Sequence, residues 1–291
     1  MKKIIRIMTA GLLVCGLALL GGCSTKEAEN PSEQPAKLIA AVTIVPEETF
    51  VKAVCGELAE VVTLVPPGSN PENYEPTPAQ MEKFSKASVY FTVGVPTEEA
   101  NILPNAGGVK IVSLQDDVAA AYPDRTFEEG ERDPHIWLSP KRAKVMVESI
   151  EREMCALDAA NADSYHANAK AYLAQLDELD QTIKDSLADV TNKKFVVYHP
   201  AFGYFADDYG LTMVALEEEG KEATPQHLQD VIDFAKSENI KVIFYQAEID
   251  SSQSAAFAEE LGGKTMELSP LAADYIENLK AMAALMAEVM Q

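Results

Sequence analysis

Short apolar segments alternate with amphipathic ones in two stretches of the chain, from Leu38 to about Val112 and from about Phe195 onward. Apolar strands that alternate with helices are typical of α/β domains with parallel sheets. The predicted strands are Leu38–Val45, Val61–Val65, Val89–Val93, Val109–Val112, Phe195–Tyr198, Leu211–Ala215, Val242–Tyr245 and Thr265–Leu268. The pattern therefore predicts two sheet lobes, which we place at 38–159 and 193–291.

Helical spacing dominates between the two lobes. One predicted helix face carries apolar side chains that recur every three, four or seven positions, namely Tyr165, Tyr172, Leu176, Leu179, Ile183 and Leu187. A linking helix within 160–192, of some thirty residues, would run about 45 Å and could cross a whole domain. Other predicted helices are Glu47–Leu58, Ala79–Lys86, a helix that Ser139-Pro140 begins, and Ala272–Met290. Ligands of open parallel sheets bind beyond the carboxyl ends of the strands, which here indicates the cleft between the lobes.

The first residues read as a targeting segment. Basic residues precede an apolar run, Ile7–Leu20, that is shorter than the ~20 residues of a membrane span and fits a signal peptide. The run ends in Leu-Gly-Gly-Cys, which resembles a bacterial lipobox. We therefore predict a signal peptide at 1–22, lipidation of Cys23 and a polar tether at 23–37, so that the protein is extracytoplasmic and anchored to the bacterial membrane. The alternative is an ordinary cleaved signal followed by a chance cysteine.

Charge narrows the choice of partners. The 291 residues include 24 Lys plus Arg against 46 Asp plus Glu, a net charge of −22. Such a surface repels phosphate backbones, which argues against nucleic acid, and it is compatible with cations. Of the four cysteines, only Cys55 and Cys155 fall within the predicted lobes. They could pair outside the cytoplasm, but buried free thiols are the expectation.

Two of the four histidines lie in unusual surroundings. His135 lies between two prolines in DPHIWLSP, beside the only tryptophan, and His199 directly follows a predicted strand and precedes a proline. Each, taken alone, is either a structural histidine or a ligand. His166 and His227 lie in polar helical stretches, where solvated surface side chains are expected.

Three motifs together carry a family resemblance. The proline-stiffened loop PPGSNPENYEPTP follows a predicted strand, and DPHIWLSP and VVYHPAFGYFADDYGL come later, all behind the lipobox. In this order and spacing the chain resembles the metal-binding lipoproteins of ABC importers for zinc and manganese. The resemblance implies two Rossmann-like lobes joined by one long helix, a single divalent cation between them, and His135 and His199 as ligands.

The chain departs from that family at two ligand positions. Glu72 stands where the family usually has a histidine, and Ser269 stands where it usually has an acidic residue before Pro-Leu. A carboxylate is a legitimate zinc ligand, whereas a neutral hydroxyl is a poor one. We therefore expect Glu72 to bind the ion, with the fourth position filled by Gln246, by Glu248 or by water. The acidic stretch at 128–131 is expected to be a solvated loop, with loose collection of cations as the alternative.

The leading function is capture of Zn²⁺ without catalysis and its delivery to an ABC permease. Mn²⁺ is the alternative cargo, although nitrogen ligands favour Zn²⁺ over Mn²⁺. A metal-dependent hydrolase would use the same ligands, but the chain has no H-E-x-x-H and no G-x-S-x-G motif. A surface adhesin, a description that some relatives carry, is a third class that no feature of the sequence separates from transport.

Overall fold

The computed structural model describes residues 37–127, 130–217, 223–249 and 252–291. Its strands are β1 (Leu38–Val42), β2 (Ala59–Thr63), β3 (Val89–Thr92), β4 (Lys110–Ser113), β5 (Lys194–Val197), β6 (Thr212–Ala215), β7 (Val242–Tyr245) and β8 (Lys264–Glu267). Its α-helices are α1 (Val45–Cys55), α2 (Pro78–Phe84), α3 (Leu114–Ala121), α4 (Pro140–Leu157), α5 (Ala162–Leu187), α6 (Gly203–Tyr209), α7 (Pro225–Ser237), α8 (Ser252–Glu260) and α9 (Tyr275–Val289). The shorter helical turns are η1 (Gly56–Leu58), η2 (Glu98–Ile102), η3 (Leu103–Asn105), η4 (Ile136–Leu138) and η5 (Ala159–Asn161). The predicted signal peptide and Cys23 lie outside the described residues.

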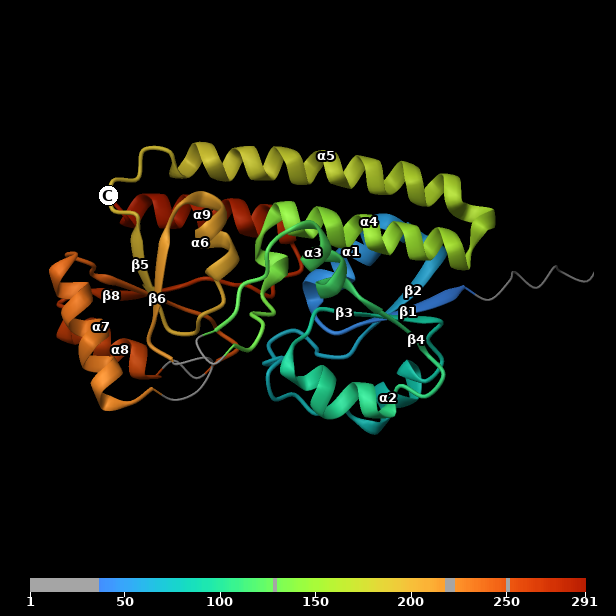
Figure 1. Cartoon of the computed structure of the whole chain (residues 1–291), viewed down its shortest axis with the longest axis horizontal. Coiled ribbons are helices and arrows are strands. Elements are labelled where there is room, and N and C mark those ends of the chain that lie inside the picture. The colour runs from blue at the N-terminus through green and yellow to red at the C-terminus, as the bar shows by residue number, and fades with distance from the viewer. Residues whose placement is uncertain (1–36, 128–129, 218–222, 250–251) are drawn as a thin grey trace, which may run out of the picture. The chain divides into compact units, whose positions relative to one another are not determined.

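Two four-stranded parallel sheets form the two lobes (Figure 1). Their strand orders are β2-β1-β3-β4 and β6-β5-β7-β8, so the second lobe repeats the topology of the first. The predicted fold class is confirmed, and each predicted strand overlaps an observed one. The first is shorter than predicted, because β1 ends at Val42 and Val45 already begins α1, whose second residue is a proline.

Alternation along the strands separates the apolar cores. In β1, Ala40 and Val42 belong to a core that extends through both lobes, while Ala41 faces a second core on the other side of the first sheet. In β5, Phe195 and Val197 likewise face the shared core, and Val196 faces a third core beneath α7 and α8. Side chains alternate between the faces of a strand, so each sheet is covered on both sides.

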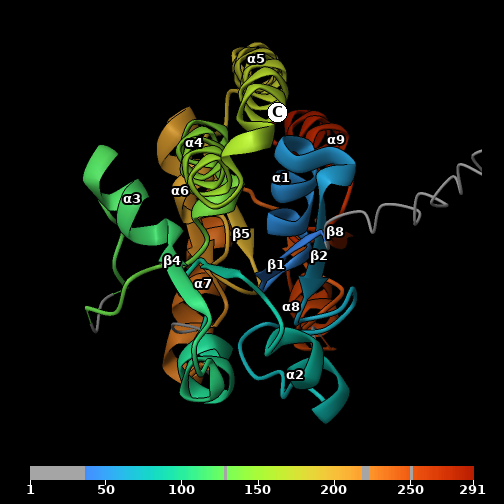
Figure 2. The same ribbon diagram turned by 90° about the vertical axis from the view of Figure 1, so that its right-hand side faces the viewer.

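Helix α5 forms the outer layer over the shared core. It has 26 residues, about 39 Å at 1.5 Å per residue, and lies above α4 and α9 (Figures 1 and 2). All six residues of the predicted apolar stripe are buried in the shared core. The burial of this stripe joins the two lobes through one apolar layer.

Within the described part of the chain, no helix is both long and apolar enough to cross a membrane.

Side-chain caps define where two of the predicted helices begin. The Oγ1 atom of Thr77 accepts a hydrogen bond from the backbone N of Gln80 (3.3 Å), and the Oε1 atom of Gln80 accepts one from the backbone N of Thr77 (2.8 Å). Ser139 caps α4 without such a reciprocal pair: its Oγ atom accepts a hydrogen bond from the backbone N of Arg142 (3.3 Å). A proline follows each cap at the first helical position, as predicted for Ser139-Pro140.

Candidate metal centre

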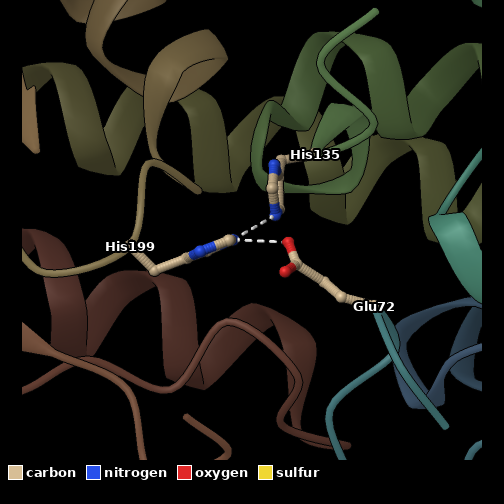
Figure 3. A group of neighbouring side chains, drawn as sticks. All are labelled: Glu72, His135 and His199. Carbon is tan, nitrogen blue, oxygen red and sulfur yellow. Dashed lines mark hydrogen bonds and ion pairs between the residues drawn. The ribbon is translucent and has the colours of Figure 1, made fainter. Parts of the chain in front are cut away.

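Glu72, His135 and His199 meet at one point between the two lobes (Figure 3). The Nε2 atom of His199 lies 3.1 Å from Oε1 of Glu72 and 3.3 Å from Nε2 of His135. One ligand atom from each residue lies within 4.8 Å of the others. Both histidines are more than nine-tenths buried, whereas the Glu72 side chain is about one-quarter exposed.

The fold brings these residues together from three loops. Glu72 lies on the proline-rich loop between β2 and α2, His135 immediately precedes η4, and His199 follows β5 after one residue. The loop that carries Glu72 is held at Tyr74, whose carbonyl oxygen accepts hydrogen bonds from Asn101 Nδ2 (2.9 Å) and from the Thr97 hydroxyl. The Glu72 carboxylate is therefore presented by an anchored loop.

Each histidine ring is also held by a carboxylate at its Nδ1 atom, on the side of the ring away from Glu72. The Nδ1 atom of His135 donates to Oδ1 of Asp133 (2.8 Å), and Nδ1 of His199 donates to Oε2 of Glu217 (2.7 Å). Ligating histidines commonly donate their other ring N–H to a carboxylate, which sets the tautomer and the ring orientation. Both Nε2 atoms are thus directed at Glu72 and at each other.

The carboxylates around His199 give the site a negative charge that suits a cation. Burial alone would lower the pKa of His199, but hydrogen bonds to Glu217 and Glu72 raise it to about 9. Burial alone would raise the pKa of Glu72, but the hydrogen bond and charge of His199 lower it. Without metal, a proton on His199 Nε2 is therefore held against the Glu72 carboxylate, and an arriving cation takes its place.

Gln246 and Glu248 supply unpaired oxygens on the fourth side of this space. Oε1 of Gln246 and Oε2 of Glu248 are buried and have no hydrogen-bond partner among the described residues, and both residues line the same small cavity as the three candidate ligands. Buried polar atoms are normally paired, so two orphaned oxygens here are what a site for a cation would show. Burial also raises the pKa of Glu248.

Ser269 takes no part in lining this cavity. Its Oγ atom lies 3.4 Å from Oε1 of Glu267, while the next two residues, Pro270 and Leu271, contribute an apolar wall. The cavity has a volume of about 10 Å³, which is room for one ion or water and not for an organic substrate. A larger cavity of about 590 Å³ lies at the opposite ends of β5 and β7, and no histidine or cysteine lines it.

The other residues considered from the sequence lie elsewhere. His166 is exposed and pairs with Glu151, as expected for a surface histidine. His227 is partly exposed, and its Nε2 atom lies 3.0 Å from the carbonyl oxygen of Ala215. Cys55 and Cys155 are free thiols; Cys55 is buried, whereas Cys155 is partly exposed. Residues 128 and 129 of the acidic stretch lie outside the described residues.

Sequence reasoning missed Asp133 and Glu217 as partners of the histidines. The signal for Asp133 was its position two residues before His135 in a stretch restrained by prolines. Glu217 follows β6 after one residue, at the same sheet edge as His199, and could have been found by asking which carboxylates lie at strand ends.

Comparisons with known proteins find relatives in sequence and in fold. The profile of the family described as "Zinc-uptake complex component A periplasmic" (ZnuA) matches residues 41–289. A crystal structure of ZnuA superposes with a TM-score of 0.82 at 35% identity, and the match covers 88% of this chain and 100% of that one.

Two curated relatives are lipoproteins. The zinc-binding lipoprotein AdcA of Streptococcus pneumoniae (strain R6) is 30% identical over 298 residues, which are 97% of this chain and 58% of AdcA. This chain therefore spans little more than half the length of that relative. The iron ABC transporter substrate-binding lipoprotein MtsA of Streptococcus pyogenes (serotype M6) is 29% identical over 276 residues, which are 90% of this chain and 87% of MtsA.

Proposed function

Because this chain belongs to the family of periplasmic zinc-uptake component A proteins, we propose that it captures one divalent transition-metal ion outside the cytoplasm and delivers it to an ABC permease. Zn²⁺ is the proposed cargo and Mn²⁺ the alternative. The convergence of Glu72, His135 and His199 on one buried point carries the proposal.

The proposed ligands are Nε2 of His135, Nε2 of His199, a carboxylate oxygen of Glu72 and Oε1 of Gln246. Imidazole nitrogen and carboxylate oxygen suit Zn²⁺ in a four-coordinate site, and the orphaned oxygen of Gln246 supports its place in the set. Glu248 and water are the alternatives for the fourth position. By the Irving–Williams order this nitrogen-containing site binds Zn²⁺ more tightly than Mn²⁺, so a manganese role would depend on metal supply.

The size of the site favours capture over catalysis. A hydrolytic zinc site keeps one position open to water and has room for substrate beside the metal. Here the cavity has a volume of only about 10 Å³, and Trp137, Pro270 and Leu271 are among the residues that line it. We therefore propose that the protein is not an enzyme, and that incubating it with trial esters and phosphates, with and without Zn²⁺, gives no turnover.

Metal content and thermal stability test the capture function. Elemental analysis of protein purified without chelator should find one zinc per chain. Zn²⁺ added to the metal-free protein should raise its melting temperature, because a ligand that binds only the native state adds RT ln(1 + [L]/Kd), about 2.7 kcal/mol at one hundred times Kd.

The two histidines provide the matched variants. His135→Ala and His199→Ala should remove most of the rise in melting temperature, whereas His166→Ala, a change at an exposed histidine outside the site, should leave it intact. A zinc response that persists in the His135→Ala, His199→Ala double variant would contradict the proposed site.

Membrane attachment completes the proposal. We propose a signal peptide at 1–22, a lipid anchor on Cys23 with a tether to residue 37, lobes at 38–159 and 193–291, and a linking segment at 160–192. The names of AdcA and MtsA as lipoproteins support the anchor. An anchor of this kind would keep the capture protein beside its permease.

A further inference from the structure

Helix α6 connects the surroundings of the two histidines. It begins four residues after His199, and its Tyr204 contacts the segment that leads to His135. The Tyr204 hydroxyl accepts a hydrogen bond from the backbone N of Arg125 (2.9 Å) and donates one to the carbonyl oxygen of Asp133 (3.1 Å). The backbone next to one histidine is thus held by a helix that follows the other.

The Arg125 guanidinium completes this connection. Its Nε atom lies 3.5 Å from Oδ2 of Asp133, whose other oxygen, Oδ1, holds the backbone N and the Nδ1 of His135 at 3.0 and 2.8 Å. The Asp133 side chain is 1% exposed, and Oδ2 has no hydrogen-bond partner among the described residues. Arg125 therefore supplies the nearby positive charge that a buried carboxylate needs.

The absence of a side chain at Gly203 makes room for the ion pair between Arg125 and Asp133. A Cβ atom at this position would lie 2.4 Å from Nε of Arg125 and 2.8 Å from Oδ2 of Asp133, closer than real Cβ contacts allow. Gly203 begins α6 with ordinary backbone angles, so the lack of a side chain serves this close approach and not an unusual turn.

We propose that Arg125 is a positioning residue for the metal site. It holds Asp133, and Asp133 in turn sets the ring of His135 so that its Nε2 atom meets that of His199. The inference rests on the proposed capture function and adds to it residues that need not contact the ion. Partners one step removed from a metal typically contribute about ten- to hundredfold to its affinity.

Two substitutions perturb the same contact in different ways. Arg125→Gln removes the charge, and Gly203→Ala displaces the guanidinium while placing a better helix former in α6. Both should weaken Zn²⁺ binding about tenfold or more in competition titrations with a chelating dye. Both should also change the visible absorption of bound Co²⁺, which reports ligand geometry and which a purely structural loss of stability would not alter.

Asp207→Asn is the matched control. Asp207 is half-exposed and contacts the far end of the same guanidinium, with Nη1 of Arg125 2.7 Å from its Oδ2. Asp207→Asn removes this contact but leaves Arg125 beside Asp133. Zinc affinity should therefore change by less than about twofold, because an exposed ion pair contributes little. Arg125→Lys keeps the positive charge but lacks the planar guanidinium with its several N–H donors. It should therefore retain part of the zinc affinity that is lost in Arg125→Gln.

The outcomes separate this inference from the capture function. If the parent protein binds Zn²⁺, and Arg125→Gln and Gly203→Ala bind it with the parent's affinity and Co²⁺ spectrum, Arg125 does not position the site although capture stands. If Arg125→Gln fails to fold, as judged by circular dichroism, the Gly203→Ala result decides. If the parent protein itself binds no Zn²⁺, both proposals are wrong.

Discussion

The Glu72 carboxylate is the one candidate ligand that brings a full negative charge directly against His199. Glu72→Gln keeps the shape of the side chain and removes that charge. We expect zinc affinity to fall by about 2 kcal/mol or more, which is over tenfold, because a charge-assisted contact in a buried site is lost. Isothermal titration with Zn²⁺ measures the change.

Ser269→Ala is the control for the Glu72 substitution, because Ser269 does not line the cavity. Its zinc affinity should equal that of the parent protein. If instead Ser269→Ala abolished binding while Glu72→Gln bound normally, the site would have to be built from other residues.

Buried groups also set how stability depends on pH. The pKa of His199 is raised from 6.5 to about 9 by Glu217 and Glu72 against the effect of burial, and burial raises the pKa of Glu98 from 4.5 to about 7. Each group binds its proton more tightly in the native state than in the unfolded state. Its stabilising contribution is therefore complete below the unfolded pKa and is lost as pH rises through the native pKa.

The free energy of unfolding of the metal-free protein should accordingly decrease between pH 4.5 and 7 through Glu98 and between pH 6.5 and 9 through His199, by at most about 1.4 kcal/mol per pH unit for each proton. Urea unfolding in the presence of a chelator, at several pH values, measures this slope. His199→Ala should flatten the slope between pH 7 and 9. A stability that increases with pH in this range would contradict the assignment of a protonated His199.

The loop between β2 and α2 shows how one segment can be stiff without regular structure. Gln80 holds both ends of it: Nε2 donates to the carbonyl oxygen of Leu64 (2.9 Å), and Oε1 accepts from the backbone N of Thr77 (2.8 Å). The Tyr74 hydroxyl donates to the same Oε1 atom (3.0 Å). The prolines and these hydrogen bonds limit the conformations of the loop, so less entropy is lost when Glu72 binds an ion.

Helix α5 should contribute to stability through its buried face. Leu176 is fully buried in the core shared by the two lobes. Leu176→Ala should lower the free energy of unfolding by roughly 2–5 kcal/mol, because it removes apolar contacts and leaves a cavity. Denaturant unfolding followed by circular dichroism measures the loss.

The neighbouring exposed position gives the comparison for this helix. Gln175→Ala should change stability by no more than about 0.5 kcal/mol. Equal effects of Leu176→Ala and Gln175→Ala would mean that α5 does not cover the core as described.

The molecule as a whole is predicted to work while tethered to a membrane. Cys23→Ser removes the thiol that would be acylated, so the protein should be released from membranes or accumulate as uncleaved precursor. Fractionation of cells followed by immunoblotting distinguishes these results from the parent's behaviour. A processed Cys23→Ser protein that still sediments with membranes would rule out the lipid anchor.

Local sequence was enough for the elements and for the two lobes. Apolar alternation and helical spacing report which side of each segment is buried, and the proline after Thr77 or Ser139 marks where a helix begins. These signals act over a few neighbouring residues, so the chain carries them before it folds. The strands, the long helix and the cleft followed from them.

Only the folded structure shows which side chains meet within the cleft. Glu72, His135 and His199 are far apart in sequence, and only the packing of the lobes brings their atoms within 4.8 Å of one another. The motifs placed these three residues at a cleft, but no pattern predicted that Glu217 would lie behind His199 or that Gly203 would make room for Arg125. Such contacts depend on the positions of atoms to within a few tenths of an ångström. Long-range packing sets these positions, and local periodicity does not encode them.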